Sequence, residues 1–181
     1  MQQVSFRRMD EGTPADYALL NRLEDEFVAA LPERILAALR ELEQSLAGYQ
    51  ISRLEHSLQS ATRAERDGAD IEMIVGALIH DLGDDLAPLN HSQLAAAIIR
   101  PYVRREVAWV IEHHGVFQMY YYGDAMGVDK NAREIYRGHK WFDSCEKFCE
   151  RWDQMSFDPD YTSYPLVHFE PLVREIFSRP P

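Results

Sequence analysis

Apolar residues recur at helical spacing along almost the whole chain of 181 residues, and this periodicity limits the possible folds more than any other feature. Leu54, Leu58 and Ala61, for example, fall on one face of a helix expected over residues 52–67. No segment shows the alternation of apolar and polar residues that marks a half-buried strand. The pattern therefore predicts an all-α protein in which residues 1–181 form a single-domain helical bundle.

Capping residues, prolines and glycines divide this pattern into helices. Thr13 followed by Pro14 is typical of a helix start, and Asp70 and Asn90 are suited to cap two later helices. We expect helices that begin at residues 14, 32, 52, 71, 91, 101, 132, 141 and 171. The sixth is expected to end near His114, which would make the tyrosine-rich segment 117–127 a connection.

The composition limits the classes of partner. The formal net charge is −11, and an acidic surface repels phosphate backbones, so nucleic acid is not an expected partner. The first residues contain no apolar segment typical of a signal peptide, and no apolar run is long enough to span a membrane. Cys145 and Cys149 lie four residues apart on one helix face and suit reduced core thiols. We therefore expect a cytoplasmic protein without a membrane segment.

Histidines and an aspartate on successive helices form the most informative chemical pattern. His56, His80, His91 and His113 fall on four successive helices, and Asp81 directly follows His80. Imidazole and carboxylate groups are the usual protein ligands of iron, manganese and zinc, and several helices can direct such ligands into one bundle core. Any one of these histidines alone is more often a core or surface residue than a ligand, but their joint occurrence favours a metal site.

Two choices within this set stay open from the residues alone. The ligand at the end of the sixth helix is either His113 or its neighbour His114. A further carboxylate from a later helix would complete the set, and Asp143 and Asp153 are the candidates.

The segment LEHSLQSATRAERDGADIEMIVGALIHDLGD, which contains His56 and the pair His80-Asp81, resembles the metal-binding core of HD-domain proteins. The additional histidines His91 and His113 resemble the dinuclear branch of that superfamily. Within this branch the segment is most similar to the mixed-valent diiron oxygenases, a group that includes the phosphonate-cleaving oxygenase and myo-inositol oxygenase.

The resemblance implies a domain layout, six metal ligands and a diiron centre. The motif core would span residues 50–155, with N-terminal helices in residues 1–49 and a C-terminal turn and helix in residues 156–181. The implied ligands are His56, His80, Asp81, His91, His113 and Asp153. Asp81 would bridge the ions and act in catalysis, and Asp153 fits the family pattern better than Asp143.

The same resemblance implies the cofactors and the reaction. The ions would be Fe2+ and Fe3+, the ferric ion binding a substrate hydroxyl and the ferrous ion binding O2. The implied activity is the oxidation or cleavage of a small hydroxylated substrate, for example an organophosphonate.

Two other functions are compatible with these ligands. A phosphohydrolase or phosphodiesterase would use Mn2+ or Zn2+ to activate a hydroxide that attacks a small phosphate ester or a nucleotide. A regulatory HD module would bind a ligand without catalysis. The signature of the HD-GYP phosphodiesterases is absent, although His113-His114 resembles their paired histidines. The lysine that follows the sixth-helix histidine in the phosphonate-cleaving oxygenases is also absent, and Phe117 lies in that segment.

Candidate substrate-binding residues accompany the expected ligands. They are Tyr49, Arg53, His114, Tyr120, Arg137 and Lys140. Arg53 lies one turn before His56 and could anchor a substrate or pair with a carboxylate. Arg137 and Lys140 could bind an anionic group or form an ordinary solvated turn. We expect a small-molecule substrate and O2 as partners, and the sequence leaves the oligomeric state open.

Overall fold

The computed structural model describes residues 2–180, and these form eight α-helices and no β-strand, which confirms the all-α class. The α-helices are α1 (Pro14–Ala29), α2 (Leu31–Glu41), α3 (Arg53–Arg66), α4 (Ile71–Ile79), α5 (His91–Ile99), α6 (Arg105–Met126), α7 (Phe142–Phe148) and α8 (Leu166–Phe177). The 3₁₀ turns are η1 (Met9–Glu11), η2 (Leu42–Gln44) and η3 (Ala132–Tyr136). A π-helical turn, η4 (Cys149–Asp153), directly continues α7.

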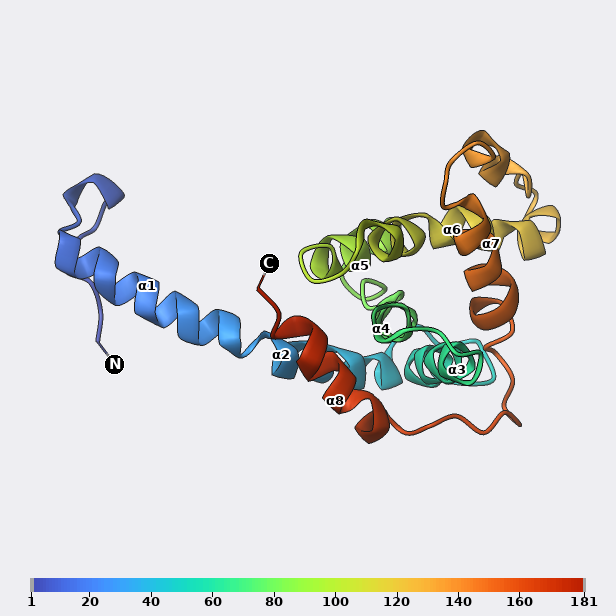
Figure 1. The fold of residues 1–181 in the computed structure, drawn as a ribbon, viewed down its shortest axis with the longest axis horizontal. Helices are drawn as coiled ribbons and strands as arrows, with labels where there is room; N and C mark the ends of the chain where they lie inside the picture. The colour runs from blue at the N-terminus through green and yellow to red at the C-terminus, as the bar shows by residue number, and fades with distance from the viewer. Residues whose placement is uncertain (1, 181) are drawn as a thin grey trace.

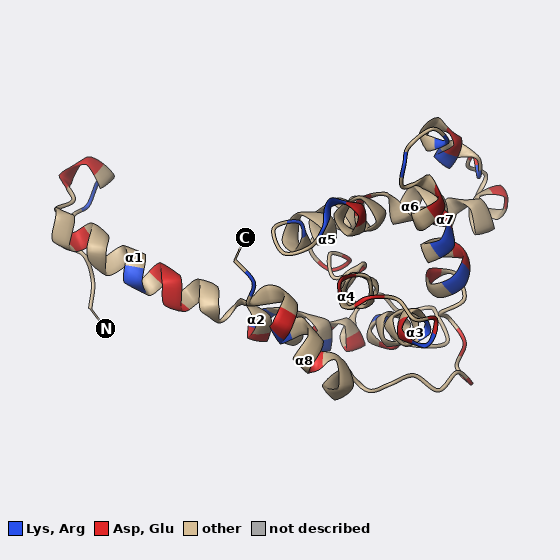
Figure 2. Cartoon of the chain, viewed as in Figure 1, with Lys and Arg blue, Asp and Glu red and all other residues tan. Residues whose placement is uncertain are grey.

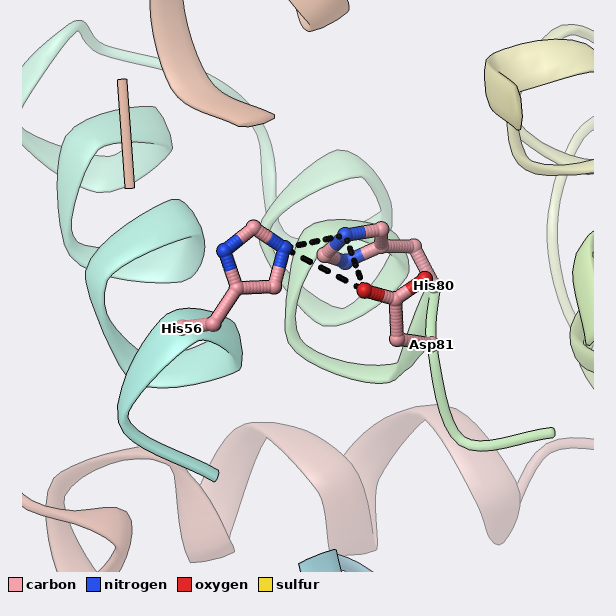
Figure 3. Close-up of side chains that lie close together, drawn as sticks. All are labelled: His56, His80 and Asp81. Carbon is pink, nitrogen blue, oxygen red and sulfur yellow. Dashed lines mark hydrogen bonds and ion pairs between the residues drawn. The ribbon is translucent and has the colours of Figure 1, made fainter. Parts of the chain in front are cut away.

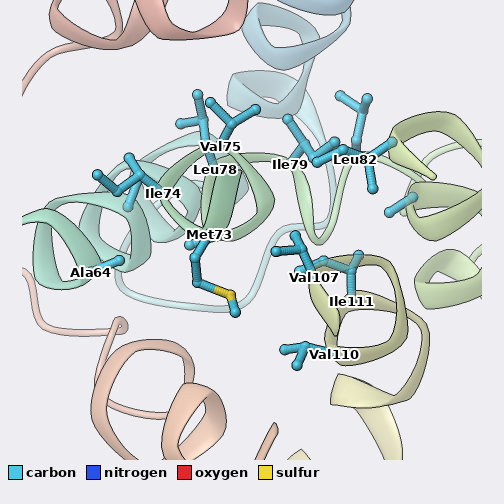
Figure 4. Packing of buried hydrophobic residues seen from close by; sticks show 14 of the residues in the cluster. Ala64, Met73, Ile74, Val75, Leu78, Ile79, Leu82, Val107, Val110 and Ile111 are labelled. Atoms are coloured by element: carbon cyan, nitrogen blue, oxygen red, sulfur yellow. The ribbon is translucent and has the colours of Figure 1, made fainter. Parts of the chain in front are cut away.

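Helix α4 is the centre of the hydrophobic core. Apart from Glu72 in its first turn, its sequence is apolar on every side, and all residues from Met73 to Ile79 are buried. It lies between α3 and α6, where Val107 and Ile111 pack against it (Figure 4). A helix that is hydrophobic all round is stable only when it is enclosed by others. The end of α4, where His80 and Asp81 follow, is therefore held inside the molecule.

Helix α1 forms an arm that leads away from the other helices (Figure 1). It begins with a capping box, in which Thr13 and Asp16 satisfy each other's backbone N–H groups, and Pro14 is its first residue. None of its residues is buried, and Phe27 and Val28 are exposed. The capping signals in the sequence therefore placed this helix correctly although it has no core to pack against.

Helix α6 runs through the tyrosine-rich segment 117–127, which was expected to be a connection. It continues past His114 to Met126 and ends at Gly127, which has a left-handed φ of 71°. Tyrosine weakens a helix only slightly, and the buried rings of His114 and Phe117 hold this part of α6 to the core. The expectation of a loop at 117–127 was therefore wrong.

Two helix starts also differ from expectation. Helix α6 begins at Arg105 rather than at residue 101, because the backbone N–H of Arg104 donates to Glu72 at 2.8 Å outside the helix. Helix α8 begins at Leu166 and includes Pro171, and the fully buried ring of Phe169 holds its first turn in the core.

Charged residues lie on every described α-helix except α5, and acidic residues are frequent on α1 (Figure 2). None of the described helices is both long and apolar enough to cross a lipid bilayer.

Candidate metal centre

Two histidine rings meet edge to edge inside the bundle (Figure 3). His56 comes from the first half of α3 and His80 from the residue after α4, and both side chains are almost completely buried. Their Nε2 atoms lie 3.0 Å apart. The carboxylate of Asp81 points at the same space, with Oδ2 at 3.2 Å from the Nε2 atom of each ring.

Asp81 also faces a second pair of histidines through its other oxygen. Its Oδ1 atom lies 3.3 Å from Nε2 of His114 on α6 and 3.4 Å from Nε2 of His91 at the start of α5. Each oxygen of one buried carboxylate is therefore directed at two imidazole nitrogens. This arrangement is suited to a carboxylate that bridges two metal ions.

Backbone carbonyls determine which nitrogen of three rings faces the centre. The Nδ1 atoms of His56, His80 and His114 each lie 2.7 Å from a carbonyl oxygen, those of Ser156, Ala77 and Ile111. A carbonyl only accepts hydrogen bonds, so each Nδ1 carries the proton and each Nε2 presents a lone pair to the centre. Two lone pairs at 3.0 Å repel each other unless a proton or a metal ion lies between them.

The π-helical turn η4 supplies a second carboxylate. This wide turn is closed by the bond from the N–H of Gln154 to the carbonyl of Cys149 at 3.0 Å, and Asp153 at its end points into the cluster. Its Oδ1 atom lies 3.4 Å from Nε2 of His56, and Gln118 donates to the same oxygen at 2.8 Å. Its Oδ2 atom is buried and has no hydrogen-bond partner among the described residues. A buried carboxylate oxygen without a partner is costly, and a bound cation would satisfy it.

The donor set fits two metal ions. Three groups of side chains each place three ligand atoms within 4.8 Å of one another, and Asp81 belongs to two of them. These groups are His56, His80 and Asp81; His80, His114 and Asp153; and Asp81, His91 and His114. All donors are imidazole nitrogens or carboxylate oxygens, a set that suits iron, manganese or zinc.

The pKa shifts in this cluster have clear electrostatic causes. Burial lowers the pKa of His56 and His80, but the carboxylates of Asp81 and Asp153 outweigh it, so both pKa values lie above that of an ordinary histidine. Burial raises the pKa of Asp81, but the charges of His80 and Arg53 hold it well below its usual range. The buried carboxylates therefore remain ionised and attract positive charge to the histidine nitrogens.

Arg53 holds the bridging carboxylate from its outer side. Its guanidinium pairs with Oδ2 of Asp81 and donates to Asp84 at 2.7 Å. Asp84 in turn lies 3.5 Å from Nδ1 of His91, so it can orient that ring. Of the two roles considered for Arg53, the geometry shows the pairing with a carboxylate.

Gly83 allows α5 to approach the end of α4. A Cβ atom at this position would lie 2.8 Å from the carbonyl oxygen and 2.9 Å from the Cα of His91. Only a residue without a side chain fits there. The glycine after His80-Asp81 is therefore part of how the chain brings His91 to the centre.

The structure does not bring His113 to the centre and places His114 there instead. Successive residues of a helix point about 100° apart, so only one of the pair can face inward. The ring of His113 stacks on Trp109 with 4.2 Å between centroids, and its Nδ1 atom bonds to the carbonyl of that residue. The ligand expected at His113 is thus corrected to His114. Asp143 is exposed, whereas Asp153 is buried in the cluster.

A pocket of about 970 Å³ opens above these ligands. Tyr49, Arg53 and His114, three of the expected substrate-binding residues, line it. The other three lie outside: Arg133 covers the ring of Tyr120 at 3.7 Å, Arg137 pairs with Glu134, and Lys140 lies over Trp141 at 4.2 Å. The anion-binding role considered for Arg137 and Lys140 therefore has no support at this pocket.

Other pocket residues gave no usable signal in the sequence. Gln118, Asp84 and Phe157 all line the pocket, and Phe157 stacks on His56 with 4.3 Å between ring centroids. Gln118 lies in the segment expected to be a loop. A helix expected to continue through residue 118 would have placed Gln118, four residues after His114, on the same face as that histidine.

Comparison with known proteins agrees with this geometry. The family model described as the HD domain matches residues 53–155, more than half of the chain. A curated protein of Leisingera caerulea, [1-hydroxy-2-(trimethylamino)ethyl]phosphonate dioxygenase (glycine-betaine-forming), is 28% identical over 89 residues. That match covers 43% of this chain and 45% of the relative, so it spans less than half of either protein. The family match, together with histidine and aspartate side chains converging from α3, α4 and α6, shows that the chain belongs to the HD-domain family.

Proposed function

We propose that this protein is a diiron oxygenase, an HD-domain enzyme that uses O2 to oxidise or cleave a small hydroxylated substrate. One observation carries the proposal: the carboxylate of Asp81 lies between two histidine pairs, with one oxygen directed at each pair. A single ion would need only one of these pairs. The second pair, His91 and His114, supports a centre with two ions.

The imidazole and carboxylate donors and the similarity to a dioxygenase both favour iron as the metal. The candidate ligands are four imidazoles and two carboxylates, with no thiolate, a set well suited to iron. The relative is named as a dioxygenase, and its similarity supports O2 chemistry here. Bound iron would supply the redox steps and the Lewis acidity for a substrate hydroxyl.

The residues of the chain have separate tasks in this proposal. Arg53 and Gln118 hold the carboxylates of Asp81 and Asp153, so that neither can rotate away from the centre. Phe157 covers one face of His56 and limits the access of water from that side. Fixed ligands and a partly dry site keep a reactive centre from oxidising its own surroundings.

The pocket indicates the kind of substrate. Its one cationic side chain, Arg53, is already paired with two carboxylates, so an anionic group would have to bind the metal ions themselves. Tyr49, Tyr121 and Tyr122 offer aromatic faces, and Asp85 adds negative charge. Such a lining favours a substrate with a neutral or positively charged end, for example an ammonium group. The name of the relative contains a trimethylamino group, in line with this lining.

Partners and location follow from the same proposal. We propose a small molecule and O2 as the partners of the pocket, no nucleic acid, and a cytoplasmic location.

Metal analysis and EPR of protein purified without O2 and then partly oxidised provide the test. We expect about two irons per chain and a mixed-valence signal that changes when a hydroxylated substrate is added. The Asp81→Asn and Asp153→Asn variants should lose the signal. Asp143→Asn is the matched control, because it makes the same chemical change on an exposed residue of α7.

The alternative outcomes are distinct. Manganese or zinc, with turnover of a phosphate ester, would replace the oxygenase by a phosphohydrolase. A folded protein that binds no metal would refute both enzyme functions and leave a regulatory module.

A further inference from the structure

We propose that the protein has a second binding site, for a small oxyanion of the phosphate or phosphonate type, at the C-terminal end of α3. The site is a separate hollow of about 210 Å³. It is lined by Arg63, Arg66, Asp67, Arg151, Trp152 and Tyr161. This inference does not depend on the reaction proposed for the metal centre.

The charge of the hollow is opposite to that of the whole chain. Three guanidinium groups line it against one carboxylate, that of Asp67, in a protein whose net charge is −11. Asp67 pairs with Arg151. Among the described residues, neither Arg63 nor Arg66 has a carboxylate partner. Such a cluster of cations attracts an anion that can neutralise it.

The arginines are held in place before any ligand binds. The guanidinium of Arg63 lies over the ring of Tyr161 at 3.8 Å, and Arg66 donates to the hydroxyl of the same tyrosine at 2.9 Å. The Nε atom of Arg63 is buried without a hydrogen-bond partner among the described residues. Basic residues appear both on α3 and on the helical segment after α7 (Figure 2). The C-terminal end of a helix favours cations, which helps to hold them there.

The geometry favours a tetrahedral oxyanion. Guanidinium groups bind phosphate oxygens through paired N–H donors, and several such groups from different directions can each take a different oxygen. A water molecule takes about 30 Å³ of liquid volume, so the hollow has room for such an ion with some of its hydration shell. A flat carboxylate would leave part of these donors without an acceptor.

The hollow is separate from the metal centre but linked to it. Arg66 lies ten residues after His56 on α3, which is about 15 Å along the helix axis. Trp152 lines the hollow, and its indole N–H donates to Asp67 at 3.2 Å. The next residue, Asp153, lies in the metal cluster. An anion that draws Arg151 away from Asp67 would therefore alter the surroundings of Trp152.

NMR titration of the full chain with inorganic phosphate tests the proposal. The chain has three tryptophans, so the indole N–H region shows three signals, and a Trp152→Phe variant assigns the relevant one. We expect saturable movement of the Trp152 signal, with Trp109 and Trp141 unchanged. The titration is run on zinc-loaded and on metal-free protein, and the same affinity is expected in both. Sulfate should compete, and acetate at equal ionic strength should not.

Variants identify the residues involved. Arg63→Gln combined with Arg66→Gln should weaken phosphate binding by about tenfold or more, because each lost hydrogen bond between charged groups weakens binding by about that factor. The matched control is Arg7→Gln with Arg105→Gln, which removes the same charge from two exposed arginines outside the hollow. If the double variant does not fold, the single variant Arg66→Gln still tests the proposal, because Arg66 is exposed and its replacement should not disturb the fold.

Three results would overturn the proposal. The first is phosphate binding that occurs only with metal present, since it would place the anion at the metal centre. The second is an effect that sodium chloride or acetate reproduces. The third is equal loss of binding in the control variant.

Discussion

Replacement of Gly83 by alanine should damage the metal centre more than it damages the fold. The new Cβ atom would lie 2.8 Å from the carbonyl oxygen of His91, whereas ordinary contacts of this kind begin at 3.4 Å. The two backbones would have to separate by about 0.6 Å, because a packed interior has little free space. Metal–ligand distances tolerate only about ±0.2 Å. The shift would therefore take His91 out of bonding range.

The two effects differ in size. Overpacking of this kind costs about 1–3 kcal/mol, and each kcal/mol lowers the Tm of a chain of this length by about 2–4 °C. We expect a folded variant that binds one ion with nearly normal affinity and the ion shared by His91 and His114 about 10–100-fold more weakly.

Isothermal titration of the metal-free protein with Fe2+ under anaerobic conditions measures both affinities, and a thermal melt measures stability. Gly138→Ala is the matched control, since no atom lies within 4 Å of its Cβ position. A Gly83→Ala variant that binds two ions as the wild type does would refute the reasoning, and so would equal weakening in the control.

Three further predictions follow from the structure. His114→Gln should remove about one metal ion per chain, whereas His113→Gln should keep both, as metal analysis can show. Chelation should lower the Tm, because each ion present at about 1,000 times its Kd adds about 4 kcal/mol to the free energy of unfolding; an unchanged Tm would contradict a structural role for the ions. Burial raises the pKa of Glu72, but its bonds to Arg104 and Arg179 outweigh this and lower it below the usual 4.5. The stabilisation by ionised Glu72 should be complete above the usual pKa of 4.5 and should be lost as the pH falls through the lowered pKa. Glu72→Gln should therefore flatten the acid side of a curve of stability against pH.

The sequence predicted the helices whose starts are marked by capping residues or proline. Thr13-Pro14 and Asp70 mark helix starts that the structure confirms, because their capping bonds are local and depend on a few adjacent residues. Asn90 precedes α5 as expected, but its side chain makes no capping bond. The tyrosines of α6 carry no local sign of a helix, because their helical state depends on packing against residues distant in the sequence.

The residues of the metal centre could be predicted from the sequence only in part. His80-Asp81 stands out as a pair, but His113 and His114 differ only by a rotation of about 100° around the axis of α6, and no local signal fixes that rotation. It is determined by the packing of Phe117 and the other buried residues of the helix. The carbonyl of Ser156, which orients the ring of His56, lies a hundred residues away from it and cannot be seen in the sequence, whereas the carbonyls of Ala77 and Ile111 lie within one helical turn of their histidines.

Because η4 is a π-helical turn, the loss of one residue there has a different effect from such a loss elsewhere in a helix. Deleting the exposed residue Glu150 would let the segment return to an ordinary α-helix, with α7 undisturbed before it. The loss of one residue and the loss of the wide turn compensate each other, so Asp153 would keep its direction towards the histidines. The same deletion within an ordinary α-helix would turn every later residue of that helix by about 100°. An alignment that closes a one-residue gap here would assign the wrong acid to the site in any related chain that lacks the extra residue.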